Sequence, residues 1–401
     1  MTSGWAATRR GSPVRGNDPP RVALIGANGH GRWHRRTIAE LHAAGRARLV
    51  ALVDVRPLEA EPDAPVPPET GVFTDHRTML AESRPDVVVV CTPPHTHLPI
   101  AIDVLAAGAD LLLEKPPVLD LAEHLTLAAA ADVAGRAVQV NFQALGSAAL
   151  TELTGALGRL APVTGIATLA AWQRPDAYYA RSPWAGRRSV DGRPALDGAL
   201  ANPLAHALMQ CLAVAESITG APVRPARIEV ERYRVRPIEV DDTAVLRLTP
   251  HAGPPVLAAL TLAAEEHVAG EVLVTGERGR AVLEYPTDRL RLPGDDALRP
   301  VPGRRGLLAN LLDHRADGTP LIAPLARTEP FTAVLDALRD APVPALLDGD
   351  LVREAGDGPQ RVRMVRGVGA VLRTAAETGA LPSEAGVPWA LPPYVVDLPA
   401  Q

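Results

Sequence analysis

The stretch that decides the fold is residues 22–31, Val22-Ala-Leu-Ile-Gly26-Ala-Asn28-Gly29-His30-Gly31, followed by a helical pattern to about residue 43. A buried strand that enters a helix through a glycine-rich turn is typical of a dinucleotide-binding loop, Gly-x-Gly-x-x-Gly. Gly26 supplies the tight turn, and Gly31 lets helix and strand approach closely. Asn28 replaces the middle glycine and, as an asparagine, tolerates left-handed backbone angles. The loop amides, including those of Gly29 and His30, are predicted to bind a pyrophosphate.

Around this loop, strands and helices alternate through residues 21–142. The predicted strands are 22–25, 49–53, 87–91, 111–113 and 137–140, and the predicted helices are about 31–43, 76–82, 96–107 and 120–134. This alternation favours βαβ units and a doubly wound parallel sheet. Asp54 ends the second strand, where a carboxylate can bind the adenosine ribose of NAD. Arg56 could instead meet the 2′-phosphate of NADP, and a turn cap is the other interpretation of Asp54.

From about residue 163 the pattern changes to successive strands joined by short turns, which predicts a large, mostly antiparallel open sheet. These strands are expected at 163–172, 228–235, 243–249, 256–262, 271–275 and 281–285, with helices at about 203–218, 305–315, 330–340 and 362–378. Residues 341–360 and 381–401 are expected to be irregular. The resulting α/β protein has a disordered tail (1–20), an NAD(P)-binding Rossmann domain (21–142) and a substrate-binding and oligomerisation domain (143–401).

Composition excludes some classes of protein. The 401 residues are 47% hydrophobic and carry a net charge of −5 without a basic stripe, which argues against a nucleic-acid partner. No apolar run approaches the roughly 18 residues of a membrane span. The two cysteines, Cys91 and Cys211, are interpreted as buried thiols, so a cytoplasmic location is expected. We expect no metal site.

Lys115 is the single lysine of the chain, among 41 basic residues. It follows the strand 111–113 within Glu114-Lys115-Pro116, at the edge where parallel sheets bind ligands. Arginine is bulkier and keeps its proton, so a site that needs a compact ammonium cannot use it. The alternative is the chance survival of one surface lysine. We interpret Lys115 as a catalytic residue that polarises the reacting hydroxyl.

Two motifs together carry a family resemblance. Thr92-Pro93-Pro-His-Thr-His97 and Glu114-Lys115-Pro116 closely resemble the Gfo/Idh/MocA family of glucose–fructose oxidoreductase and inositol dehydrogenase relatives. Further matches are residues 25–34, Asp54, Phe142-Gln143 and a late helix with His206, so the resemblance covers about residues 21–290.

The resemblance implies hydride transfer between a sugar or cyclitol carbon and a bound nicotinamide. It implies that Thr92, Pro93, His97, Glu114 and Gln143 lie on the cofactor side, with a commonly cis peptide before the proline of the Glu-Lys-Pro motif. A capping or surface role is the alternative for His97, and a solvent-exposed charge is the alternative for Glu114. It also implies a homodimer or homotetramer formed through the C-terminal sheet.

The family has an aspartate four residues before the histidine of the late helix, whereas this chain has Asn202 before His206. Asn202 is predicted to cap the helix, with Pro203 in its first turn. His206 is expected on the more polar face with Gln210, where the helix dipole disfavours a protonated ring and leaves a neutral general base. A pure cap is the alternative for Asn202. Asp197 is a candidate for the missing carboxylate.

Aromatic residues concentrate in one loop-like stretch, which suggests carbohydrate binding alongside Lys115, Asn202 and His206. The candidate residues are Trp172, Arg174, Tyr178, Tyr179 and Trp184. The alternative is a loop packed on the sheet by its aromatic rings. Arg174 or Arg181 would also suit an acidic sugar or a phosphate.

Together these features predict an NAD-dependent oxidoreductase for a sugar or cyclitol, with NADP possible as cofactor. Lys115 would polarise the hydroxyl and His206 would act as general base. One alternative is an epimerase or glycoside-cleaving enzyme with retained NAD. Another is a non-catalytic sensor of NAD and sugar, which Asn202 slightly favours and the lone Lys115 opposes.

Overall fold

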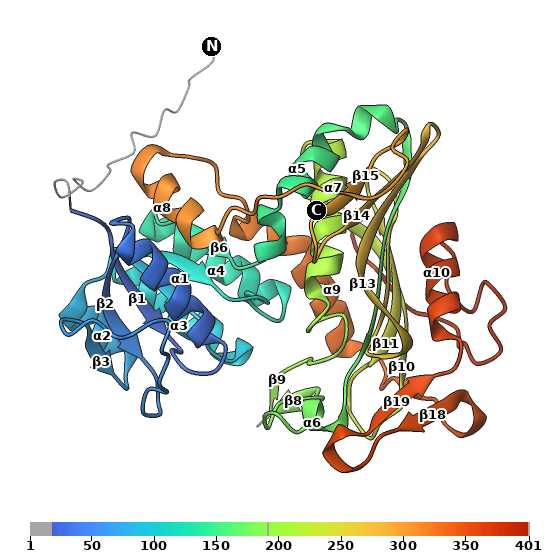
Figure 1. Cartoon of the computed structure of the whole chain (residues 1–401), viewed down its shortest axis with the longest axis horizontal. Helices are drawn as coiled ribbons and strands as arrows, with labels where there is room; N and C mark the ends of the chain where they lie inside the picture. The colour runs from blue at the N-terminus through green and yellow to red at the C-terminus, as the bar shows by residue number, and fades with distance from the viewer. Residues whose placement is uncertain (1–17, 191, 400–401) are drawn as a thin grey trace.

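The computed structural model describes residues 18–190 and 192–399, arranged around two sheets (Figure 1). The prediction of a disordered tail falls largely on residues 1–17, which lie outside the described part. The N-terminal sheet has six parallel strands in the order β3-β2-β1-β4-β5-β6. They are β1 (Arg21–Ile25), β2 (Arg48–Val53), β3 (Gly71–Phe73), β4 (Val87–Val90), β5 (Asp110–Leu113) and β6 (Val138–Val140). The doubly wound parallel sheet is confirmed; the short edge strand β3 was missed.

Helices flank this sheet: α1 (Gly31–Ala43), α2 (His76–Ser83), α3 (His97–Ala106) and α4 (Leu121–Ala134). All four valines of β4 are buried, as expected for a central strand covered on both faces. The strand order reverses between β1 and β4. Ligands of such sheets bind outside the carboxyl ends of the strands at this reversal, which is where Gly26 and Thr92 lie.

The second sheet has the strand order β16-β15-β14-β13-β7-β12-β11-β10-β17, with β20 also paired to β10. Its strands are β7 (Val163–Gln173), β10 (Pro225–Arg234), β11 (Thr243–Pro250), β12 (Val256–Thr261), β13 (Ala263–Gly276), β14 (Gly279–Glu284), β15 (Arg289–Arg291), β16 (Arg299–Pro300), β17 (Ala345–Leu346) and β20 (Tyr394–Asp397). Within the described part of this second sheet, only the pairs β7–β12 and β10–β17 are parallel. The prediction of a mostly antiparallel sheet is confirmed.

Successive residues of the central strands alternate between two cores. Ile166 and Ala170 face a core shared with α7 (Ala205–Thr219), α9 (Glu329–Asp340) and the Rossmann sheet, whereas Ala167 and Leu169 face a second core. The helices α5 (Ala148–Gly155) and α8 (Leu307–Asp317) also contribute to the shared core. The shared core therefore joins the active side of the large sheet to the nucleotide-binding domain.

The opposite face of the large sheet is covered by the chain's own C-terminal part (Figure 1). Helix α10 (Val368–Thr378) inserts Val368 and Leu372 against this face, after a hairpin of β18 (Val352–Ala355) and β19 (Val362–Val365). The predicted helix 362–378 thus begins only at residue 368, and residues 341–360 and 381–401 are not wholly irregular. Helix α10 of the same chain covers this face, which was expected to form the oligomer interface. Assembly through the C-terminal sheet stays a prediction.

Three small elements lie in the connection between β7 and α7: α6 (Asp176–Tyr179), β8 (Ser189–Val190) and β9 (Arg193–Pro194). Helix α6 lies within the aromatic stretch that ends at Trp184, and β8 and β9 follow it. Among the described residues, no helix combines the length and apolar character needed to cross a bilayer.

Candidate active site

The glycines of the dinucleotide loop lie in close backbone contacts. A Cβ atom at residue 31 would lie 1.8 Å from the Gly26 carbonyl oxygen, and one at residue 26 would lie 2.1 Å from the Cys91 carbonyl oxygen. Gly26 also adopts a φ of +86°, which favours glycine. These contacts leave no room for a side chain, and the cradle fits the close approach of a pyrophosphate to the start of α1. His30 precedes α1 and is exposed.

Asn28 does not adopt the left-handed backbone expected of it; Gly29, with a φ of +55°, takes that conformation instead. The Asn28 side chain is buried and joins two loops. Its Nδ2 donates to the Pro57 carbonyl oxygen (3.0 Å), and its Oδ1 accepts from the Glu59 amide (2.8 Å). The asparagine therefore replaces a glycine's backbone freedom with a cross-link to the loop after β2.

Asp54 lies beneath the same loop. Its carboxylate accepts from the backbone amides of Asn28 (2.9 Å) and Arg56 (3.0 Å). The Arg56 side chain is 66% exposed, and its Nε lies 3.9 Å from the carboxylate. Asp54 thus caps its turn and also fixes the glycine loop. Its binding of the adenosine ribose stays a prediction.

Glu114 is buried, so its interpretation as a solvent-exposed charge is wrong. It accepts hydrogen bonds from His34 Nε2 (2.8 Å), Asn141 Nδ2 (2.6 Å) and the Lys115 amide (3.0 Å). Burial raises the pKa of Glu114, but the hydrogen bonds from His30 and His34 outweigh this and hold its pKa well below the usual range. Although no metal was expected, the ligand atoms of Glu114 and the two histidines lie within 4.8 Å of one another, a spacing that could hold a cation.

His97 is fully buried, which rules out the surface role. Its Nδ1 lies 2.9 Å from the Pro116 carbonyl oxygen and its Nε2 lies 2.8 Å from the Thr92 carbonyl oxygen. Burial lowers its pKa. The ring therefore braces the loop of Thr92 and Pro93 against the segment after Lys115, and the loop itself forms the surface beside Gly26.

Lys115 and Asn202 meet across the two domains. Lys115 Nζ donates a 2.6 Å hydrogen bond to Asn202 Oδ1, although the residues are 87 positions apart. The peptide before Pro116 is cis, as the resemblance implies, and so is the peptide before Pro203. Burial lowers the pKa of Lys115, and the charges of Glu114 and Asp197 oppose this effect. The lone lysine is thus a half-buried, partnered group, and the interpretation as a surface lysine is wrong.

Asn202 does not cap α7, so that prediction is wrong. The helix begins at Ala205, with Leu204 at the N-cap position and no side-chain cap. Both ends of the Asn202 amide are used elsewhere, because its Oδ1 accepts from Lys115 and its Nδ2 donates to Asp197. The helix start consequently falls two residues beyond the predicted position.

His206 lies in the first turn of α7, with its ring edge-on to Phe142 at 5.8 Å. Within the described residues, its buried Nδ1 has no hydrogen-bond partner. Burial, and next the charge of Lys115, lower its pKa to about 3, so the ring is neutral as expected. The predicted polar face is wrong, however, since Gln210 is fully buried: α7 lies within the shared core, packed against the large sheet.

Asp197 completes a chain of side chains that the sequence only hinted at. Its Oδ1 accepts from Asn202 Nδ2 (3.0 Å), and both oxygens accept from Arg181 NH2 (2.9 and 2.7 Å). The amide of Gly186 donates to Oδ2 (3.0 Å). Asp197 is buried, and this raises its pKa. The site thus contains a carboxylate one hydrogen-bonded residue away from Lys115.

The aromatic stretch holds two arginines over rings. The Arg181 guanidinium lies 3.8 Å from the Tyr178 ring centre and 4.8 Å from that of Trp184. Arg174 lies 4.7 Å from Trp172 and 5.2 Å from Tyr178. Arg181 therefore connects this cluster to Asp197, and Asp197 connects through Asn202 to Lys115.

Tyr179 and Trp172 are held differently from the others. The Tyr179 ring lies against Arg236 at 5.1 Å, and Trp172 Nε1 donates to the Ala269 carbonyl oxygen (2.8 Å). Both contacts fit the interpretation in which the rings pack the loop onto the sheet. On the cofactor side, Gln143 begins a short helical turn after β6, and its buried Oε1 has no partner among the described residues. An unsatisfied amide oxygen at the carboxyl edge of the sheet suits a polar cofactor.

The two cysteines differ in their exposure. Cys211 is buried, whereas Cys91 at the end of β4 is partly exposed, so only one of the two predictions is confirmed.

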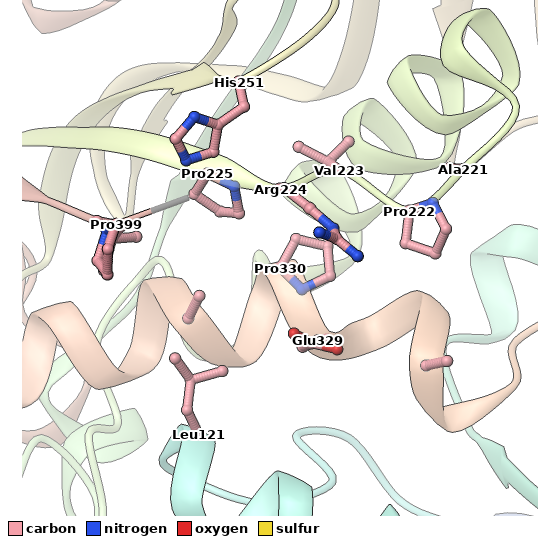
Figure 2. A pocket seen from close by; sticks show the side chains of 13 residues that line it. Leu121, Ala221, Pro222, Val223, Arg224, Pro225, His251, Glu329, Pro330 and Pro399 are labelled. Carbon is pink, nitrogen blue, oxygen red and sulfur yellow. The ribbon is translucent and has the colours of Figure 1, made fainter. Parts of the chain in front are cut away.

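A cavity of about 220 Å³ lies where α9 meets the α7–β10 connection (Figure 2). Its walls include Pro222, Pro330 and His251, and none of the predicted site residues, all of which are described, lines it.

Comparison with known proteins agrees with this geometry. Residues 20–142 match the Gfo/Idh/MocA oxidoreductase family, described as having an NAD-binding Rossmann fold. This part of the chain is therefore similar to the NAD-binding Rossmann domain of that family.

The chain is similar to an inositol 2-dehydrogenase of Paracoccus denitrificans, 31% identical over 124 residues (30% of this chain and 36% of the relative). It is 29% identical to the D-glucoside 3-dehydrogenase of Escherichia coli over 131 residues, which are 31% of this chain and 35% of the relative. The matched part thus spans about a third of these relatives. A WlbA dehydrogenase of Bordetella pertussis, crystallised with NADH and UDP-GlcNAcA, shares the fold, with a TM-score of 0.65, 22% identity and coverage of 82% of this chain and 100% of the other.

Proposed function

We propose that the protein is an NAD-dependent oxidoreductase that transfers a hydride between a carbinol carbon of a sugar or cyclitol and the nicotinamide. The observation that carries this proposal is the 2.6 Å contact between Lys115 Nζ and Asn202 Oδ1 at the carboxyl edge of an NAD-binding sheet. Ligands of such sheets bind at this edge. The names of the similar inositol and glucoside dehydrogenases support the substrate class.

The residues that would hold NAD lie at or next to this edge of the sheet. The amides of Gly26–Gly31 would face the pyrophosphate, Asp54 would face the adenosine ribose, and Glu114 and Gln143 would lie toward the nicotinamide half. Bound NAD would supply the hydride acceptor. Asp54 favours NAD because its negative charge repels a 2′-phosphate, although the exposed Arg56 leaves NADP as a possible second cofactor.

In this proposal Lys115 donates a hydrogen bond to the substrate hydroxyl and stabilises the negative charge that develops on its oxygen. Asn202 keeps the ammonium directed. His206 accepts the hydroxyl proton, because burial keeps its ring neutral and leaves a nitrogen lone pair available. With NAD bound, the carbinol carbon would give its hydride to the cofactor while the hydroxyl oxygen gives its proton to the His206 imidazole, so the two-electron oxidation of the alcohol would balance.

The polar rim of the substrate side comes from the aromatic stretch. Tyr178 and Trp184 would offer ring faces to the C–H faces of a sugar, and Arg174 would bind its hydroxyl groups or an acidic substituent. Stacked guanidinium groups are held in place, which suits recognition of a planar carboxylate better than a mobile side chain would.

The test is a screen of purified protein with NAD or NADP against myo-inositol, methyl glucosides and sugar nucleotides, followed at the nicotinamide absorbance. We expect reduction of NAD by at least one member of the panel. Nicotinamide absorbance that survives gel filtration, without net reduction, would support the alternative with retained NAD. Calorimetric binding of a sugar without cofactor reduction at any pH would contradict the proposal and support a sensor.

A further inference from the structure

We propose that Asp197 is a positioning residue that acts through Asn202 to orient Lys115. It also supplies a negative charge that the neutral Asn202, the hydrogen-bond partner of Lys115, does not carry. This inference rests on the proposed function for its role in turnover, but its physical content concerns three side chains of the unliganded protein. They form an unbroken series, with 2.6 Å from Lys115 Nζ to Asn202 Oδ1 and 3.0 Å from Asn202 Nδ2 to Asp197 Oδ1.

The two neighbours of Asn202 fix the direction of its side-chain amide. A side-chain amide has one accepting end and one donating end, and it can turn over unless its neighbours distinguish the two. Lys115 can only donate, and ionised Asp197 can only accept, so only one orientation satisfies both. Without the carboxylate, the amide could present its NH2 group to the ammonium, which would turn an attraction into a repulsion.

The charge of Asp197 also acts on Lys115. Asp197 is 4% exposed and is held by a two-pronged contact with Arg181 and by the Gly186 amide. The charged groups around it are Arg181 and Lys115, and the phenols of Tyr178 and Tyr179 lie nearby. Burial and the charge of Arg181 disfavour the ammonium form of Lys115, whereas the buried carboxylates of Glu114 and, next, Asp197 favour it. The carboxylate therefore offsets part of the desolvation of Lys115.

Arg181 connects Asp197 to the substrate side of the site. Arg181 binds Asp197 and at the same time lies over Tyr178 and Trp184. A substrate that displaces Arg181 would change the neighbours of Asp197 and, through Asn202, those of Lys115. The series thus links the aromatic rim to the ammonium group without a direct contact between them.

The chain offers an unusually clean test because Lys115 is its only lysine. Protein grown with lysine carrying 13C at Cε gives one side-chain resonance, whose shift against pH reports the Lys115 pKa without any substrate or cofactor. In Asp197→Asn we expect this pKa to fall by about one unit, because a neutral amide replaces the charge. The double variant Asp197→Asn, Asn202→Asp moves the carboxylate next to Lys115, and its pKa should return to or exceed the original.

Glu239→Gln is the matched control, because this carboxylate binds the exposed Arg187 in the same region and makes no contact with the series. A Lys115 resonance that titrates alike in the unchanged protein, Asp197→Asn and the double variant, all folded by circular dichroism, would overturn the inference. The alkaline limb of kcat should follow the same order. If the Lys115 resonance shifts in the variants but no substrate is oxidised, the proposed function fails and the inference about Asp197 stands. If substrate is oxidised but the resonance does not shift, the proposed function stands and the inference about Asp197 fails.

Discussion

The cofactor side and the substrate side of the candidate site are held in place by different kinds of contact. On the cofactor side, close contacts between backbone atoms set the geometry, as where Gly31 lies against Gly26 and Gly26 against Cys91. On the substrate side, the geometry depends on side chains that meet from distant segments, Lys115 with Asn202 and Asn202 with Asp197. The first side should therefore be sensitive to added atoms, and the second to changes of charge and hydrogen-bonding type.

The largest expected effect is on the backbone side. In Gly31→Ala the new methyl group would overlap the Gly26 carbonyl oxygen, so helix α1 must move away from the loop. We expect a loss of stability of about 3 kcal/mol or more, or loss of measurable NAD binding. Gly45→Ala is the control, because a Cβ there meets nothing within 4 Å and the left-handed strain alone should cost about 1 kcal/mol. Equal stability and NAD affinity in the two variants would contradict the account.

On the side-chain part of the site, Lys115→Arg should lower turnover about 10²-fold or more while NAD affinity changes little. The guanidinium retains the charge, but it is larger and cannot take the position of the ammonium beside Asn202. Steady-state kinetics at saturating substrate and calorimetry with NAD measure the two quantities. Near-normal kcat would remove Lys115 from the mechanism.

Buried histidines should make the fold sensitive to acid. Burial lowers the pKa of His206 to about 3 and that of His124 to about 4, whereas an unfolded histidine titrates near 6.5. The unfolded chain therefore binds more protons between these values, so stability is full above about pH 6.5 and falls as the pH drops toward 4. Each histidine should account for about 2 kcal/mol or more of this loss. Denaturant unfolding of His124→Gln should show a flatter pH dependence, and an unchanged slope would refute this assignment.

The smallest effect is expected at Asp54, which uses both kinds of contact. Asp54→Ser removes the charge that repels a 2′-phosphate and should shift the NAD-to-NADP preference about tenfold toward NADP. It also removes a carboxylate that holds the Asn28 amide, so a modest loss of stability should accompany it. Asp63→Ser, at an exposed acid of the same loop, controls for net charge. A preference for NADP in the unchanged protein would show that the role given to Asp54 is wrong.

The difference between the two sides also explains what the sequence could predict. Local spacing was enough to predict the loop at Gly26–Gly31, the strand ends at Asp54 and Lys115, and the doubly wound sheet. Backbone geometry of this kind depends on residues that are consecutive in the sequence. Lys115 stood out because it is the only lysine. The cap assigned to Asn202 was wrong because local propensity cannot show that Lys115 and Asp197, far apart in the chain, both bind its amide.

The C-terminal part shows the same limit. The family resemblance implied an oligomer formed through the C-terminal sheet, but the strands of that sheet do not themselves show what covers its second face. Leu372 and its neighbours on α10 cover it here, where a second subunit was expected. Similarly, Asn28 was interpreted through its backbone, whereas its side chain is what joins the two loops.

The most direct test of the central claim follows the hydride itself. The substrate found in the screen, deuterated at the carbinol carbon, is incubated with NAD and either the unchanged protein or Lys115→Arg, and the product nicotinamide is analysed by mass spectrometry and NMR. The account predicts one deuterium at nicotinamide C4 with the unchanged protein, and a rate of transfer about 10²-fold lower with the variant. Deuterium transfer at equal rates by both proteins would contradict the account.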